Sequence, residues 1–93
     1  MKKVTWFYMN GCPYCRQAGL ALEALLRENP AYASVEIEKI EENEHPDIAD
    51  SYDYYCVPST FVGGKKIYEA RRGESYEDAL RGVKNTLDAA LAE

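Results

Sequence analysis

The distribution of apolar residues along the chain predicts its first two elements. Residues 3–9, Lys-Val-Thr-Trp-Phe-Tyr-Met, form a β-branched and aromatic run typical of a strand that is buried on both faces. Gly11 ends this strand, and Pro13 fits the first position of a helix, which places Cys12 at the N-cap. The helix is expected to end at Asn29-Pro30. Its predicted core-facing residues are Ala18, Leu22, Leu25 and Leu26.

The middle of the chain predicts shorter elements. Residues 35–40 alternate between apolar and charged positions, which is the period of a half-exposed strand. A short helix is expected over about 46–52, because acidic residues in its first turn match the positive end of the helix dipole. Two further strands, 59–62 and 66–70, are joined by the glycine pair 63–64, which signals a tight hairpin turn.

The last predicted helix completes the fold class. Residues 75–78, Ser-Tyr-Glu-Asp, form a variant capping box at its start, and Gly82 weakens the helix by about 1 kcal/mol relative to alanine. The order strand–helix–strand–helix–strand–strand–helix predicts one α/β domain over residues 1–93. Its four-stranded mixed sheet is flanked by helices, with the first two strands parallel and the hairpin antiparallel. The predicted apolar stripe of the last helix is Tyr76, Leu80, Val83, Leu87 and Leu91.

Composition and charge exclude several classes of function. The chain has 93 residues, enough for one small domain, and a hydrophobic fraction of 46% argues against disorder. The formal net charge of −5 disfavours a nucleic-acid partner. No apolar stretch approaches the roughly 20 residues that span a bilayer, and residues 1–9 do not read as a signal peptide. We therefore expect a cytoplasmic monomer without a membrane partner.

The three cysteines predict redox chemistry rather than a framework of structural disulfides, which is uncommon in the cytoplasm. Cys12 and Cys15 lie three positions apart at the start of a helix, the spacing of a redox pair. Only a thiolate attacks a disulfide, and the helix N-terminus favours the anion at Cys12. Cys15 is expected to lie beneath it, shielded and less acidic. We expect Cys12 to attack a substrate disulfide and Cys15 to resolve the mixed disulfide.

Other interpretations of these cysteines stay open. A structural zinc site needs four ligands, and His45 and Cys56 lie in different elements without ligand spacing. Two buried, inert cysteines are the other structural interpretation. Arg16 either adds positive potential beside the cysteines or is a solvated helix charge.

Two motifs carry a resemblance to a known family. Residues 12–15 are identical to the active-site tetrapeptide of the dithiol glutaredoxins, and Val57-Pro58 resembles their Thr-Val-Pro segment. Over almost its whole length the chain resembles a glutaredoxin-like protein of the thioredoxin superfamily. The resemblance implies a thioredoxin fold and a thiol–disulfide oxidoreductase of electron transport and cell redox homeostasis, with no bound cofactor or metal. It also implies catalytic roles for the two cysteines, substrate contact by Tyr14, Val57 and Pro58, and a cis peptide bond before Pro58.

The flanking sequence departs from that family where glutathione would be held. Met9 stands where glutaredoxins usually carry Lys or Arg, and residues 68–72 lack their Gly-Gly pair. The C-terminal third is more similar to thioredoxin, and Arg71 or Arg72 can replace the missing base if either turns toward the site. Two electron donors therefore stay open, glutathione and a thioredoxin reductase. The expected substrates are disulfide-bearing proteins or small disulfides.

Cys56 occupies the position of the family's threonine and is the third cysteine of the chain. It is expected to be a small buried residue there, while a third redox thiol and a metal or cluster ligand are alternatives. Tyr52, Tyr54 and Tyr55 are expected to be packing and surface residues, although they can also form a rim around the site. An iron–sulfur or metal carrier, with Cys12 as a ligand across a dimer, is the alternative function of another class.

Overall fold

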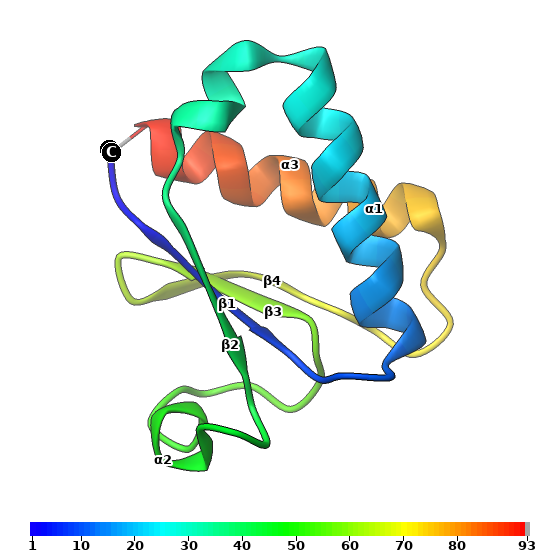
Figure 1. Ribbon diagram of the computed structural model, residues 1–93, viewed down its shortest axis with the longest axis vertical. Helices are drawn as coiled ribbons and strands as arrows, with labels where there is room; N and C mark the ends of the chain where they lie inside the picture. Colours follow the sequence, from blue (N-terminus) through cyan, green and yellow to red (C-terminus); the bar gives the residue numbers. More distant parts are fainter. Residues whose placement is uncertain (93) are drawn as a thin grey trace.

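The computed structural model describes residues 1–92 and confirms the predicted order of elements (Figure 1). The strands are β1 (Val4–Tyr8), β2 (Ile37–Glu41), β3 (Ser59–Val62) and β4 (Lys65–Glu69). The helices are α1 (Pro13–Glu28), α2 (Pro46–Ala49) and α3 (Tyr76–Ala92), with a 3-10 helix, η1 (Pro30–Ser34), between α1 and β2. Within residues 1–92, no helix is long and apolar enough to cross a membrane.

The four strands form one mixed sheet in the order β2-β1-β3-β4. Central β1 pairs in parallel with β2 and antiparallel with β3, and β3 pairs antiparallel with β4. Gly63 and Gly64 join the last two strands with φ values of 59° and 82°. Positive φ at both positions is what a tight type I′ hairpin requires, so the prediction made from the glycine pair is confirmed.

The core has two parts because side chains along β1 alternate between the faces of the sheet. Val4 and Trp6 pack against α1 and α3, whereas Phe7 packs on the opposite face with Ile40 and Phe61. Figure 1 shows the corresponding layers, with α1 and α3 together on one side of the molecule and short α2 at the far end. The prediction of a strand buried on both faces is confirmed.

Several element boundaries differ from the sequence prediction by one to three residues. The second strand begins at Ile37, not at residue 35, because Val35 is the C-cap of η1 and its amide donates to the Tyr32 carbonyl at 3.1 Å. Val35 is therefore buried at the end of η1 rather than in a strand. Helix α2 ends at Ala49, before residue 52, and β4 begins at residue 65 rather than 66.

The buried face of α3 is rotated from the predicted stripe. Leu91 is 36% exposed, and Tyr76 and Leu80 are only partly buried. The reason lies at Gly82, where a Cβ atom would stand 2.6 Å from two ring atoms of Tyr68. The sheet thus approaches α3 at its small residues, and Gly82 permits this approach instead of only weakening the helix. The buried residues of α3 are Ala79, Gly82, Val83, Thr86, Leu87 and Ala90.

Candidate active site

Cys12 lies at the N-cap of α1, as predicted. Its backbone is extended, and its Sγ accepts a hydrogen bond from the backbone N–H of Cys15 at 3.2 Å. Gly11, with φ of 79°, allows the sharp turn from β1, and Pro13 begins the helix. The sulfur thus lies at the first turn of α1, where backbone amides have no partner within the helix.

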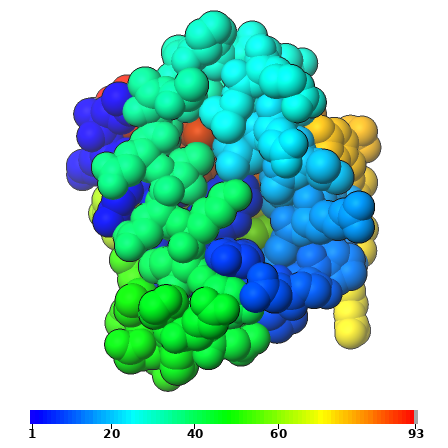
Figure 2. Space-filling view, in the orientation of Figure 1, coloured from blue at the N-terminus to red at the C-terminus, as the bar shows by residue number. Residues whose placement is uncertain are grey.

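The segment Val57-Pro58 lies beside this sulfur, although 45 residues separate Cys12 from Val57. The peptide bond before Pro58 is cis, and the carbonyl oxygen of Val57 is 3.8 Å from Cys12 Sγ. The buried Pro58 accepts a hydrogen bond from the Ala70 amide at 2.9 Å. The structure thus joins the two sequence motifs into one site, and Figure 2 shows the segment between β1 and α1 (blue) reaching the surface beside the region of β2 and α2 (green).

Cys15 is partly buried one turn below the N-cap. Burial, and then its hydrogen bond with Cys12, raise the pKa of the Cys15 thiol to about 12. Cys15 therefore keeps its proton at neutral pH. Cys15 is thus the shielded and weakly acidic thiol that the spacing predicted, whereas the attacking role of Cys12 stays a prediction.

Glu41 is a site residue that sequence reasoning missed. It ends β2 and is only 5% exposed, yet it carries a carboxylate. That carboxylate accepts hydrogen bonds from the backbone amides of Asn10 at 2.9 Å, Asn43 at 2.6 Å and Glu44 at 3.3 Å. The Asn10 amide contributes most to lowering the pKa of Glu41. Glu41 thereby fixes the loop that precedes Cys12.

Glu69 fixes a second loop of the site, as Glu41 fixes the first. From the end of β4 its Oε2 accepts the backbone amides of Tyr55 at 2.6 Å and Cys56 at 2.7 Å, while Oε1 pairs with Lys66 at 2.7 Å. Burial opposes its ionisation, but the ion pair and the two amides together lower the pKa of Glu69. This carboxylate fixes the loop that leads into Val57.

The side chain of Cys56 is exposed, so the expectation of a small buried residue is wrong. The reason is that the loop is held by its backbone: the Cys56 amide donates to Glu69, and its carbonyl accepts from Ser59 Oγ at 2.5 Å. A side chain that the loop does not use for packing is left in solvent. Among the described residues 1–92, no three His, Cys, Asp or Glu side chains gather as a metal site would require.

The neighbouring tyrosines are packing and surface residues, as expected. Tyr52 and Tyr54 each lie 4.8 Å from Phe7 between ring centroids, in the core of the second sheet face. Burial, and then a hydrogen bond to Glu42, raise the pKa of Tyr54. Tyr55 is 91% exposed.

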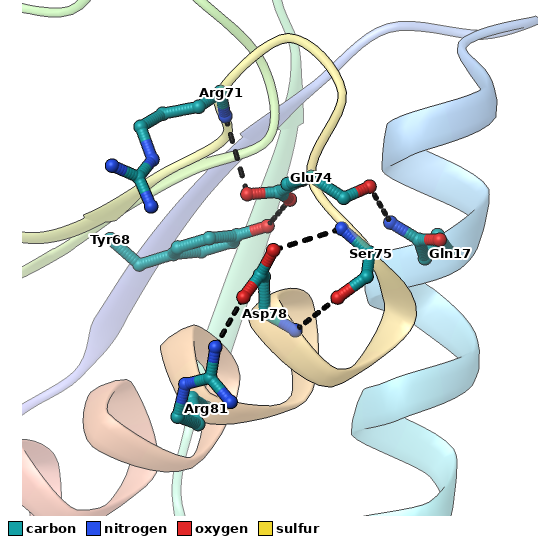
Figure 3. A network of polar contacts seen from close by, with 7 residues as sticks. All are labelled: Gln17, Tyr68, Arg71, Glu74, Ser75, Asp78 and Arg81. Atoms are coloured by element: carbon teal, nitrogen blue, oxygen red, sulfur yellow. Dashed lines mark hydrogen bonds and ion pairs between the residues drawn. The ribbon is translucent and has the colours of Figure 1, made fainter.

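The remaining candidate residues differ in how they are placed relative to Cys12. The hydroxyl of Tyr14 accepts a hydrogen bond from the Gly73 amide at 2.6 Å, which ties α1 to the loop before α3. Arg16 lines the surface next to Cys12. Arg71 lines a different groove from those that contain Cys12, and Figure 3 shows its guanidinium beside Tyr68, across Glu74 from Gln17 of α1. Arg72 is exposed in the same loop.

A polar network supports this α3 end of the site (Figure 3). Glu74 accepts hydrogen bonds from the Tyr68 hydroxyl and from the Arg71 amide, and Gln17 of α1 reaches the Glu74 carbonyl at 3.4 Å. Burial, and then the contact with Glu74, raise the pKa of Tyr68. Ser75 and Asp78 exchange amide hydrogen bonds, which confirms the predicted capping box.

Two grooves meet at Cys12. One, of about 330 Å³, is also lined by Met9, Cys15, Arg16 and Lys39. Lys39 lies in β2 with its Nζ 5.4 Å from the centre of the Trp6 ring, and its place in the site had no signal in the sequence. The other groove, of about 480 Å³, runs along α1 toward α3.

Comparisons with known proteins bear on the fold and site described above. No family model and no curated protein matches the sequence. Among solved structures, oxidized mitochondrial thioredoxin 3 from Saccharomyces cerevisiae is 28% identical, with a TM-score of 0.62 over 90% of this chain and 77% of that chain. A protein disulfide oxidoreductase from Aeropyrum pernix K1 is 29% identical, with a TM-score of 0.56 over 99% of this chain and 38% of that chain. Oxidized glutaredoxin 2 from Chlamydomonas reinhardtii is 22% identical, with a TM-score of 0.53 over 98% of this chain and 80% of that chain.

The chain therefore has the thioredoxin fold, a mixed four-stranded sheet flanked by helices. Its solved neighbours are thioredoxin- and glutaredoxin-type proteins, and Cys12 and Cys15 lie together at the start of α1 as a CxxC motif. At the level of this superfamily, the neighbours support thiol–disulfide oxidoreductase chemistry.

Proposed function

We propose that this protein is a small cytoplasmic, glutaredoxin-like thiol–disulfide oxidoreductase that reduces protein or small-molecule disulfides. One observation carries the proposal: Cys12 Sγ accepts the Cys15 amide at the start of α1 and lies 3.8 Å from the Val57 carbonyl. A nucleophile, a resolving thiol and a backbone edge for the substrate thus share one site.

The two cysteines divide the reaction into two exchanges. In the first, the Cys12 thiolate attacks one substrate sulfur, a mixed disulfide forms, and the other substrate sulfur leaves and takes up a proton. In the second, Cys15 loses its proton and attacks Cys12 Sγ, which releases the remaining substrate thiol. The dithiol has then supplied two electrons and has become the Cys12–Cys15 disulfide. The backbone of Val57 positions the substrate during both exchanges.

The electron donor that restores the dithiol is either glutathione or a thioredoxin reductase. Met9 supplies no charge for a glutathione carboxylate, and Arg71 is not among the residues that line the grooves at Cys12. Lys39 and Arg16, however, line the groove that contains both cysteines, and they are the cations available there for an anionic thiol. This groove favours glutathione as the donor, with recognition that differs from that of the usual glutaredoxin site.

A donor comparison tests the proposal. Reduction of bis(2-hydroxyethyl) disulfide is measured with glutathione plus glutathione reductase, and separately with thioredoxin reductase. Turnover with glutathione that falls in Lys39→Gln but not in Lys65→Gln, a lysine of the hairpin, supports the proposed donor. Turnover with thioredoxin reductase but not with glutathione would instead assign thioredoxin reductase as the electron donor. Cys12→Ser must abolish turnover with either donor, and activity that survives this change contradicts the proposal.

A further inference from the structure

The groove along α1 begins at the nucleophile itself. Cys12 and Pro13 line one end, and Leu20 and Tyr76 line the part between α1 and the start of α3. Leu20 is 51% exposed, although it lies in a helix whose other leucines are buried or partly buried. Leu20 is thus an exposed apolar side chain in the groove that contains the reacting sulfur, and a substrate bound at Cys12 can contact it.

The dimensions of the groove fit an extended segment of polypeptide. Cys12 and Leu20 are eight residues apart, which corresponds to about 12 Å along a helix. An extended chain covers that distance with three or four residues. A small disulfide held at Cys12 is too short to reach Leu20.

Besides the reacting Cys12 and the hydroxyl of Tyr76, the lining of the groove has two polar side chains. Arg16 is the charged side chain among the residues that line it, in a protein whose formal net charge is −5, and Gln17 is the other polar one. The segment that fits best therefore carries a large apolar side chain and no cation facing Arg16.

The groove is held in shape by contacts on both of its walls. Tyr14 of α1 accepts the Gly73 amide at 2.6 Å, and Gln17 reaches the Glu74 carbonyl at 3.4 Å, as Figure 3 shows for Gln17. Both contacts tie α1 to the chain that leads into α3. The surface is thus preorganised, and a segment that binds there does not have to order it first.

We propose that this groove is a recognition subsite for protein substrates, and that it receives a large apolar side chain three or four residues from the substrate cysteine. The proposal rests on the function proposed above, and it makes extended protein segments the preferred substrates of that chemistry. Val57 is not among the residues that line the groove, so substrate contact at its carbonyl and contact at Leu20 involve different parts of the surface around Cys12. The two contacts together hold the segment while the sulfurs exchange.

Leu20→Ser tests the subsite, with Leu91→Ser on α3 as the matched control because Leu91 is also partly exposed but lies outside the groove. The substrates are a disulfide-linked peptide with leucines three and four residues on each side of its cysteine, the same peptide with serines there, and bis(2-hydroxyethyl) disulfide. We expect Leu20→Ser to lower kcat/KM about fivefold for the leucine peptide, the effect of losing burial of the exposed half of a leucine. The other two substrates and the control variant should be unaffected.

Equal loss on all three substrates, or no loss on the leucine peptide, overturns the subsite. Wild-type protein that reduces none of these disulfides contradicts the proposed function instead. In that case the subsite is tested by binding alone, with fluorescence anisotropy of the labelled leucine peptide in which serine replaces the cysteine. Weaker binding to Leu20→Ser than to Leu91→Ser supports the subsite, and equal binding overturns it. Thermal denaturation of both variants checks that each is folded.

Discussion

The carboxylate of Glu41 accepts a hydrogen bond from the backbone amide of Asn10 at 2.9 Å, and Asn10 lies two residues before Cys12. This contact joins the end of β2 to the loop that delivers the nucleophile. The same carboxylate holds the amides of Asn43 and Glu44. A buried anion with three backbone donors is therefore part of the support of the active site, although it does not touch the substrate.

Removal of this charge should loosen the loop. In Glu41→Gln, the side-chain NH2 cannot accept a hydrogen bond, so one oxygen is left to serve amides that two oxygens serve now. We expect a lower Tm and a lower kcat/KM, with restoration in part by Glu41→Asp. Glu38→Gln is the control, because Glu38 lies on the same strand in an exposed pair with Lys3. Loss of activity of the same size in both variants would show that Glu41 has no particular role.

The stability of the protein should fall in acid because of Glu41 and Glu69. Both carboxyl groups have a pKa below the ordinary value of 4.5. A lowered pKa in the folded state contributes stability that is present above the unfolded value and is lost as the pH falls through the folded one. Tm should therefore decrease as the pH is lowered below about 4.5, and less steeply in the Glu41→Gln, Glu69→Gln double variant. Parallel Tm profiles for the two proteins would contradict this prediction.

The thiol of Cys15 should resist alkylation at neutral pH. With a pKa of about 12, its thiolate fraction at pH 8 is ~10⁻⁴. The exposed Cys56 should react with iodoacetamide roughly 100-fold faster or more. Mass spectrometry of the reduced protein after timed quenching measures both rates. Modification of Cys15 as fast as that of Cys56 would mean that its burial does not protect its proton.

Two helical glycines should respond in opposite directions to alanine. A Cβ at Gly82 would stand 2.6 Å from ring atoms of Tyr68, so we expect Gly82→Ala to destabilise the protein by about 1–3 kcal/mol. Gly19 in α1 has no neighbour within 4 Å of a built Cβ, and Gly19→Ala should stabilise by up to ~1 kcal/mol. Urea denaturation measures both changes. Stabilisation by both substitutions would show that the ring of Tyr68 moves aside without cost.

Features set by neighbouring residues could be predicted from the sequence. Gly11 and Pro13 fix the turn and the first helical position, so the N-cap place of Cys12 follows from the chain around it. The hairpin follows in the same way from Gly63-Gly64. The position of Val57-Pro58 beside the cysteines came instead from the resemblance to glutaredoxins, because no local pattern links segments 45 residues apart.

Features set by tertiary contacts could not be predicted. Glu41 is one of a run of acidic residues, and only the partner amides, one of them 31 residues earlier, distinguish it from a solvated turn charge. The role of Glu69 in the site could not be predicted for the same reason. The buried face of α3 depends on where the ring of Tyr68 lies, which helical periodicity does not contain. Cys56 was predicted to be buried because cysteine usually is, whereas its loop is held by hydrogen bonds from its backbone to the side chains of Glu69 and Ser59.

Trapping of the mixed disulfide tests the division of labour between Cys12 and Cys15 most directly. Cys15→Ser protein is treated with a disulfide peptide, quenched in acid and mapped by mass spectrometry, with Cys15→Ser, Cys56→Ser as the matched control. We predict that the first peptide adduct forms on Cys12 and accumulates equally in both proteins because the resolving thiol is absent. An adduct on Cys56 that forms before the one on Cys12 in the single variant, or none on Cys12 in either protein, would contradict the assignment of Cys12 as the nucleophile.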